Sequence, residues 1–361
     1  MLNLNEPVPL RCGAVLPGRT ALAPMTNRQS HDDGTLSDDE YHWLLRRAVG
    51  GFALTSTCAA FVCEEGKAWP GQLGIADDGH LPGLTRLATA LNATGTVSIV
   101  QLHHGGKRAK LAPGRRLSAS EDAEYDTRAA EPADLDRLVR RFTEAAVRAE
   151  RAGFSGVEVH GANGYVFTQF LSPTDNRRTD DYGGSLENRA RLLRRTVQAI
   201  RARVGSGFVV GVRISPVDVG PRWGLTLADS CRLSAWLVED GVDFIHLSLG
   251  DAAASPPFED EARPVARVIR EAIPESVPVV AAGGIGSAAD AERALDAGVE
   301  VLSIGRAAIV EPDWPRQVSM PGWLPTAPPW TRERLAEVAV SDKLWTYLTL
   351  FPGLTVDSPE P

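Results

Sequence analysis

Three side chains that can donate protons follow a short apolar run near the middle of the chain. The run predicts a strand that ends at His160, and Asn163 and Tyr165 come soon after it. Gly161 and Gly164 favour a tight turn between them, because glycine adopts backbone angles that other residues avoid. An imidazole, an amide and a phenol would then converge on one small ligand. We interpret this cluster as the edge of an active site, although a histidine at a strand end is often structural.

Two glycine turns later in the chain could hold a phosphate group. One apolar run ends in Gly283 and Gly284, and a helix is expected from about Ala288. One strand later, Gly305 is followed by Arg306, which adds a permanent positive charge. Such turns let backbone N–H groups approach a phosphate oxygen, and the loops after strands seven and eight of a barrel commonly do so. The alternative is that these glycines only close tight connections between strands and helices.

Two polar residues stand at the ends of other apolar, strand-like runs. Arg213 follows Val209–Val212, and Gln101 follows Val97–Val100. Burying an arginine without a partner is costly, so Arg213 predicts an anionic neighbour. That neighbour is either a bound ligand or a core carboxylate, and both alternatives stay open.

Short apolar runs alternate with helix-like segments, which predicts an α/β fold of the (β/α)8 TIM-barrel class. An open, doubly wound sheet is the alternative. The eight strand-like runs are residues 20–24, 52–57, 96–102, 156–160, 208–214, 244–249, 277–282 and 299–304. An amphipathic helix is expected over 134–152, and helix starts are expected near Thr226 and at Ser37, the latter with a capping box to Glu40.

Long insertions follow three of the predicted strands, at residues 108–132, 161–185 and 250–261. In a barrel, loops of this kind build the catalytic face. The barrel is expected over about residues 20–310, and a proline-rich linker and one helix over 332–350 follow within 311–361. We therefore expect a single domain over 1–361, whose aromatic tail helix packs on the barrel or on a second copy of the chain.

The composition argues against several classes of function. The 361 residues include 46 acidic and 38 basic ones, and the formal net charge of −8 does not favour a nucleic-acid partner. No apolar run approaches the roughly 18 residues that a membrane-spanning helix needs. The first residues lack a signal-peptide pattern, so a cytoplasmic location is expected. Metal-ligand spacing is missing from the cysteines, so no metal site is expected; these are Cys12, Cys58, Cys63 and Cys231.

The strings around these residues resemble the Old Yellow Enzyme family of flavin-dependent ene-reductases. The longest string runs from His160 to Arg189 and contains His-Gly-Ala-Asn-Gly-Tyr, Gln-Phe-Leu-Ser-Pro and Asp-Asp-Tyr-Gly-Gly-Ser-Leu-Glu-Asn-Arg. Shorter matching strings are Ala23–Thr26, Gln101–Gly105, Val212–Pro216, Ala282–Ile285 and Ile304–Arg306. Together they span most of the chain, and the resemblance implies a TIM barrel that binds FMN tightly but not covalently.

The resemblance implies a role toward FMN for each of these residues. The phosphate would be held by Gly283, Gly284, Gly305 and Arg306. The pyrimidine edge of the ring would be contacted by Gln101 and by Arg213, the latter near N1 and O2, where reduction places negative charge. Backbone contacts would come from Ala23, Pro24, Met25 and Thr57. The hydroxyl of Thr26 would point at the C4 carbonyl and N5, where some family members have cysteine.

The resemblance also implies a reaction. His160 and Asn163 would each direct an N–H at one carbonyl or nitro oxygen of a small-molecule substrate, which polarises its conjugated double bond. Tyr165 would then give a proton to the α carbon. NADPH or NADH would supply the hydride through FMN. His103 would either line the substrate pocket or be merely structural.

Three other functions are compatible with such a flavin site. An amine demethylase or dehydrogenase would keep the flavin chemistry, but Tyr165 beside an imidazole and an amide favours the reductase. A tRNA-modifying flavin reductase would need a basic surface, which the net charge does not supply. A flavin-binding protein without turnover is the last alternative. Arg28 and Trp223 lie near the expected substrate loops, and no role is assigned to them.

Overall fold

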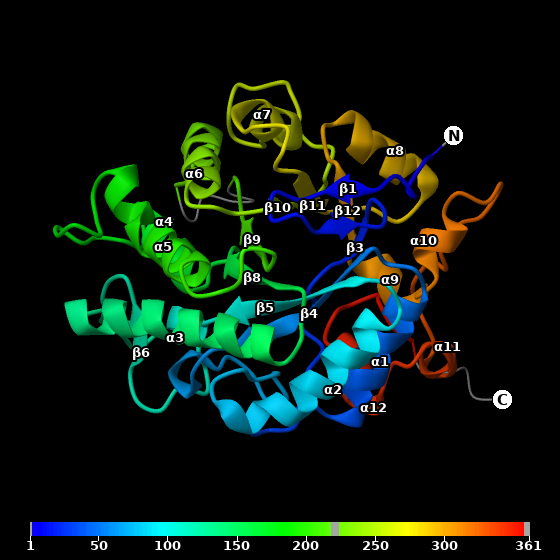
Figure 1. The fold of residues 1–361 in the computed structure, drawn as a ribbon, viewed down its shortest axis with the longest axis horizontal. Coiled ribbons are helices and arrows are strands. Elements are labelled where there is room, and N and C mark those ends of the chain that lie inside the picture. The colour runs from blue at the N-terminus through cyan, green and yellow to red at the C-terminus, as the bar shows by residue number, and fades with distance from the viewer. Residues whose placement is uncertain (1, 218–223, 357–361) are drawn as a thin grey trace.

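The computed structural model describes residues 2–217 and 224–356 of the chain. Eight parallel strands close into a barrel, and helices surround it (Figure 1). In their order around the barrel the strands are β3 (Thr20–Leu22), β4 (Leu54–Phe61), β5 (Val97–His103), β8 (Gly156–Gly161), β9 (Val209–Ile214), β10 (Phe244–Ser248), β11 (Val279–Ala282) and β12 (Val301–Ile304). The predicted (β/α)8 TIM barrel is confirmed.

Each of the eight strand-like runs in the sequence forms one barrel strand, with small differences at the ends. The largest difference is in β4, which continues past Thr57 to Phe61. A bulge between Ser56 and Ala59 places one extra residue of β4 against β5. Thr57 therefore lies inside its strand rather than at the end of it.

The interior of the barrel changes from apolar to polar along the strands. Near the strand starts, Ile99, Val209 and Phe244 belong to one buried apolar cluster. Gly211 makes room for the Phe244 ring, because a Cβ on this residue would lie 2.0 Å from the ring. Alternate residues of a strand face the same side. The next interior positions are polar and buried, and they include Gln101, Glu158 and His246.

The outer helices bury one apolar face against the strands. Helix α3 (Pro132–Arg151) does so with Leu135, Leu138 and Phe142, at three- and four-residue spacing. It confirms the helix predicted over 134–152. The remaining outer helices are α1 (Asp38–Val49), α2 (Leu81–Asn92), α5 (Leu186–Arg201), α6 (Leu227–Glu239), α7 (Val265–Ala272) and α8 (Ala288–Asp296). Among the described helices, none combines the length and the apolarity needed to cross a bilayer.

The two predicted helix starts differ in their caps. Thr226 caps α6 as predicted, and Ser37 Oγ accepts a hydrogen bond from the Glu40 backbone at the start of α1. The Glu40 side chain does not return to Ser37. It is buried and accepts hydrogen bonds from Asn27 and Ser30 instead. The capping box predicted here is therefore only half formed, because tertiary contacts occupy the carboxylate.

Short elements extend both ends of the barrel. The loops at the carboxyl ends of the strands carry η1 (Glu64–Gly66), η2 (Asp78–His80), η3 (Gly106–Arg108), the parallel pair β6 (Arg116–Ser118) and β7 (Thr127–Ala129), and α4 (Val166–Leu171). At the other end lies the antiparallel hairpin of β1 (Val8–Pro9) and β2 (Val15–Leu16). Its Leu10 and Leu16 join the apolar cluster at the strand starts.

The described segment after β12 forms several helices, and the predicted single helix over 332–350 is wrong. The helices are α9 (Arg306–Val310), α10 (Trp314–Gln317), α11 (Arg332–Glu337) and α12 (Asp342–Leu348). The interruption occurs because Ala339 has a φ of +63°, after which Ser341 caps α12. Trp345 and Leu348 of α12 belong to the main core, so this helix packs back on the barrel (Figure 1).

Candidate active site

A cavity of about 620 Å³ lies at the carboxyl ends of the barrel strands. The ends of β3, β9, β11 and β12 contribute to its wall, together with residues 325–328 and Trp330 from the segment after the barrel. Most of the predicted cofactor residues line it, namely Ala23, Pro24, Met25, Arg213, Gly283, Gly284, Gly305 and Arg306.

The turn after β11 comes very close to the loop after β10. A Cβ on Gly283 would lie 2.6 Å from the carbonyl oxygen of Leu249. Gly284 has a φ of +64°, in the left-handed region. Both positions therefore need glycine for the turn itself, and the turn lines the cavity. Gly305 differs, since a Cβ there would make only ordinary van der Waals contacts.

Arg306 stands at the first position of α9 and is exposed at the cavity. In residues 2–217 and 224–356, no hydrogen bond or ion pair engages its guanidinium. A guanidinium whose N–H groups are not used by the protein matches two oxygens of a phosphate group in geometry and in charge.

Arg213 is buried with 8% of its surface exposed, and it lacks an ionic partner in the described chain. Nη2 donates to Ser248 Oγ at 3.0 Å and Nη1 to the Pro24 carbonyl oxygen at 3.4 Å, while Nε has no partner in the described chain. Burial lowers the pKa of Arg213, and the nearby charge of Glu158 opposes this. The sequence left two alternatives for the anionic neighbour of Arg213, a bound ligand or a core carboxylate. Among the described residues no carboxylate forms an ion pair with Arg213, and this favours a bound ligand.

Gln101 is held by a carboxylate inside the barrel. Its Nε2 donates to Glu158 Oε1 at 2.7 Å, and Glu158 Oε2 lies 2.7 Å from His246 Nδ1. Burial would raise the pKa of Glu158, but His246, Arg213 and Gln101 outweigh this and hold the pKa below its ordinary value. Gln101 lies beside Glu158 and level with Gly211, which is two residues nearer the strand starts than Arg213. It does not line the cavity.

Glu158 and His246 were missed in the sequence, although a signal for Glu158 was present. Glu158 interrupts an apolar strand two residues before His160, so both side chains face the barrel interior. A buried charge in such a run requires a partner, by the same argument that singled out Arg213. The partner His246 could not be deduced, because it depends on the register of β10 across the barrel.

The rings of His103, His160 and Tyr165 form one cluster. The ring centroids lie 4.4 Å apart for His103 and Tyr165, 5.1 Å for His160 and Tyr165, and 5.6 Å for the two histidines. Trp69 covers this cluster, with its ring centroid 5.3 Å from that of His103. Gln72 Nε2 lies 3.1 Å from Nδ1 of His103. His103 is thus fully buried in this cluster and does not line the cavity of about 620 Å³.

Asn163, two residues before Tyr165, is linked to Arg213 through a shared serine. It adopts a left-handed conformation with a φ of +60°, and its backbone N–H donates to Ser215 Oγ at 2.9 Å. Its Oδ1 accepts a hydrogen bond of 3.0 Å from Ser248 Oγ, the hydroxyl that also accepts from Arg213. Because Oδ1 is occupied in this way, Nδ2 is the side-chain atom that remains to donate to a ligand.

Protonation states in the cluster suit hydrogen-bond donation. Burial keeps the pKa of His160 well below its ordinary value, and the charges of His103, Arg213 and His246 add to this. His160 is therefore neutral at pH 7 and can donate through one nitrogen, while its Nδ1 is buried without a partner in the described chain. Burial raises the pKa of Tyr165, which keeps the phenol protonated.

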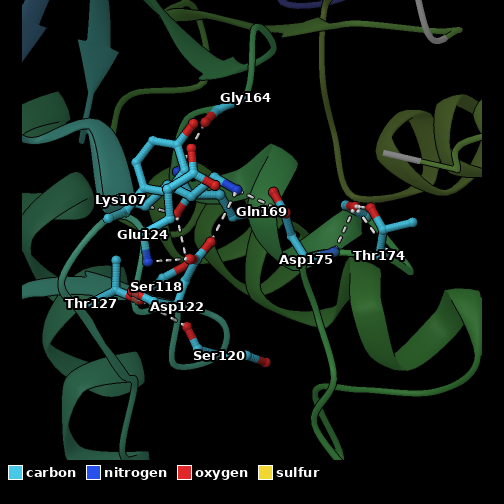
Figure 2. A network of polar contacts seen from close by, with 12 residues as sticks. Lys107, Ser118, Ser120, Asp122, Glu124, Thr127, Gly164, Gln169, Thr174 and Asp175 are labelled. Atoms are coloured by element: carbon cyan, nitrogen blue, oxygen red, sulfur yellow. Dashed lines mark hydrogen bonds and ion pairs between the residues drawn. The ribbon is translucent and has the colours of Figure 1, made fainter. Parts of the chain in front are cut away.

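A buried amide holds together the two loops that carry these residues. Gln169 of α4 donates from Nε2 to the carbonyl oxygens of Gly105 and Gly164, at 3.3 and 2.9 Å. Its Oε1 accepts from Lys107 N at 3.0 Å and from Ser118 Oγ at 3.1 Å, as Figure 2 shows. All four hydrogen-bonding positions of this amide are used, which fixes the loop of Gly164 against the loop after β5.

Thr26 and Thr57 have environments apart from the main cavity. Thr26 lines a neighbouring cavity of about 530 Å³ with Tyr347 of α12, whose ring lies 4.5 Å from the guanidinium carbon of Arg28. Thr57 Oγ1 donates to the Cys58 carbonyl oxygen at 2.8 Å. The aromatic tail was expected to pack on the barrel or on a second copy of the chain, but the position of Tyr347 beside Thr26 and Arg28 was not predicted. Trp223 lies outside the described residues.

The residues present fit FMN. The cavity offers a glycine turn and a guanidinium at one side, and the buried Arg213 at another. Two buried polar atoms on its lining residues, Arg213 Nε and Ser303 Oγ, lack partners in the described chain, as expected where a polar ligand belongs. The barrel and this site are those of an enzyme class that carries a phosphate-bearing cofactor at the carboxyl ends of its strands.

Comparisons with known proteins narrow this class to one family. Residues 3–321 match the model of the NADH:flavin oxidoreductase / NADH oxidase family. A probable NADH-dependent flavin oxidoreductase of Bacillus subtilis (strain 168) is 36% identical over 323 residues, which are 86% of each chain. An NADPH dehydrogenase of Bacillus pumilus (strain SAFR-032) is 36% identical over 313 residues, 84% of this chain and 90% of its own. The solved structure of morphinone reductase in complex with tetrahydroNAD matches with a TM-score of 0.79 at 25% identity, over 95% of this chain and 97% of that one.

The chain belongs to the NADH:flavin oxidoreductase family, and its resemblance to the Old Yellow Enzymes is confirmed. It is an NAD(P)H-dependent flavin oxidoreductase, and FMN is the flavin of this family.

Proposed function

We propose that the protein is an FMN-dependent ene-reductase that reduces the activated C=C bond of α,β-unsaturated carbonyl or nitro compounds. The observation that carries the proposal is the cluster of His160, Asn163 and Tyr165. A neutral imidazole lies with its ring centroid 5.1 Å from that of a phenol that burial keeps protonated, and Ser248 orients the amide two residues before the phenol. Hydrogen-bond donors for an oxygen and a proton source for carbon are the two functions that such a reduction needs.

The cofactor would be held by residues of the barrel ends. Gly283, Gly284, Gly305 and Arg306 would hold the phosphate, and Arg213 would lie at the pyrimidine edge of the ring. Gln101 would contribute to the same edge. Backbone atoms of Ala23, Pro24, Met25 and Thr57 and the hydroxyl of Thr26 would complete the site. When bound, FMN would supply the redox chemistry between NADPH or NADH and the unsaturated bond.

The residues above the cofactor would bind and polarise the substrate. His160 and Asn163 would donate to one carbonyl or nitro oxygen, which draws electron density away from the β carbon. Ser248 holds the Asn163 amide in the orientation that leaves Nδ2 to donate. Tyr165 would deliver the proton to the α carbon, and His103 would support the Tyr165 ring edge-on. A raised pKa suits this role, since the donor must stay protonated until carbanion character develops.

Two measurements on the purified protein test the proposal. Chromatography of the flavin released by denaturation should give FMN. Under anaerobic conditions, oxidation of NADPH or NADH should depend on cyclohex-2-enone and yield cyclohexanone in equal amount. Release of FAD, or nicotinamide oxidation that is the same without the enone, would overturn the proposal.

A further inference from the structure

Arg108 is a cation beside the proposed proton donor. It ends η3, in the loop after β5, and it is half-buried. Its Nη1 donates to the backbone carbonyl oxygen of Asn163 at 3.0 Å. Its guanidinium carbon lies 5.9 Å from the centroid of the Tyr165 ring. Arg108 therefore touches the loop that carries Asn163 and Tyr165, two of the three residues proposed to act on the substrate.

The neighbouring cation is neutralised, whereas Arg108 is not. Lys107 Nζ lies 2.7 Å from Asp175 and 3.8 Å from Asp122, as Figure 2 shows. In residues 2–217 and 224–356, Arg108 has no carboxylate within ion-pair distance. The one hydrogen bond that its guanidinium makes in these residues is to a neutral carbonyl, so Nε and Nη2 have no hydrogen-bond partner in them.

The charge is also held in place. Gln169 binds the backbone of Lys107 and the carbonyl oxygen of Gly164, which fixes the loops on both sides of Arg108. A half-buried guanidinium that is positioned in advance loses little conformational freedom when it binds an anion. Its remaining N–H groups suit the two oxygens of a carboxylate better than a single oxygen.

We propose that Arg108 binds a carboxylate substituent of the unsaturated substrate, and thereby gives the enzyme a preference for anionic enones over neutral ones. This inference rests on the proposed ene-reductase function and adds a substrate class to it. The oxygen held by His160 and Asn163 and the carboxylate held by Arg108 would lie on either side of the bond that is reduced. The substrate would then be fixed at two points beside Tyr165.

A matched pair of substrates isolates the effect of the charge. Pent-3-en-2-one and trans-4-oxopent-2-enoate differ only in the replacement of a methyl group by a carboxylate. The FMN-loaded wild type should have a higher kcat/KM for the acid. Arg108→Gln, which can still donate to Asn163, should lower the acid-to-ketone ratio of kcat/KM by about tenfold to a hundredfold, the range for a lost hydrogen bond to a charged group. Arg108→Lys should restore part of the ratio.

Two controls distinguish carboxylate binding by Arg108 from a general effect of loop charge and from recognition of the nicotinamide phosphates. Lys110→Gln removes an exposed cation from the same loop and should leave the ratio unchanged. The rate of flavin reduction by NADPH and by NADH, followed by stopped flow, should change less in Arg108→Gln than the rate of reoxidation by the acid. If the variant slows only reduction by the nicotinamides, Arg108 recognises their phosphates and the inference is wrong. An unchanged substrate ratio also overturns it, whereas failure of the wild type to reduce either compound would overturn the proposed function itself.

Discussion

Gln101 Nε2 donates a hydrogen bond of 2.7 Å to Glu158 Oε1, and both side chains are buried inside the barrel. The second carboxylate oxygen of Glu158 lies 2.7 Å from His246 Nδ1. One carboxylate thus fixes an amide and an imidazole at the level just below Arg213. The polar floor of the site is a connected network, which is stabilising only while each member keeps its partners.

Replacing Glu158 should therefore cost stability. Glu158→Leu leaves Gln101 and His246 without their acceptor, and we expect the free energy of unfolding to fall by about 3 kcal/mol, as for other buried pairs that lose one partner. Glu158→Gln keeps one acceptor and should lose less. Urea unfolding of the FMN-loaded protein measures both. A loss below about 1 kcal/mol for Glu158→Leu would show that the network does not stabilise the fold.

Local pattern predicted the barrel and the glycine and arginine residues that line the cavity, but not the network beneath it. Gly283 and Gly284 were found because a turn of this kind needs glycine, and Arg213 because a buried charge needs a partner. The residues that contact these side chains are set by the register of the strands and by how far the C-terminal tail folds back on the barrel. Ser248 and Tyr347 lie far along the chain from the residues they contact, and no spacing within one segment indicates such pairs. The split of the tail helix at Ala339 escaped prediction because alanine gives no sign of a positive φ.

Arg306→Ala should weaken FMN binding by about 2 kcal/mol, the cost of one hydrogen bond to a charged group. Riboflavin lacks the phosphate, so its affinity should hardly change. Fluorescence titration of the flavin-free protein with both ligands gives the comparison. Arg293→Ala, which removes an exposed arginine from α8, serves as the matched control. Equal losses for FMN and riboflavin would place Arg306 away from the phosphate.

The buried histidines predict a loss of stability in acid. Burial lowers the pKa of His104 from 6.5 to about 4 and that of His103 to about 3. As pH falls below 6.5, these histidines take up protons in the unfolded chain before they do so in the folded protein, which favours unfolding. Their contribution to the free energy of unfolding is therefore complete above pH 6.5 and is lost toward about pH 4. Each contributes about 1.4 kcal/mol per pH unit within this window.

The part of this dependence of the unfolding free energy on pH that comes from His104 can be measured separately. His104 Nδ1 accepts from the Gly106 backbone at 3.0 Å, and the side-chain oxygen of asparagine can take over this hydrogen bond. Urea unfolding of the FMN-loaded His104→Asn variant between about pH 6 and about pH 5 should give a dependence of the unfolding free energy on pH that is shallower than that of the wild type by about 1.4 kcal/mol per pH unit. Parallel slopes for variant and wild type would mean that His104 is not kept neutral by burial.

The most direct test of the proposed reaction is a stopped-flow comparison of the wild type with Tyr165→Phe, under anaerobic conditions and at the flavin absorbance band. The variant keeps the ring that packs against His103 and loses only the hydroxyl. Flavin reduction by NADPH or NADH needs no proton on carbon and should proceed at nearly the wild-type rate. Reoxidation by cyclohex-2-enone should slow by about a hundredfold or more, the usual contribution of a positioned acid. Equal slowing of both half-reactions, or of neither, would contradict the assignment of Tyr165 as the proton donor of an ene-reductase.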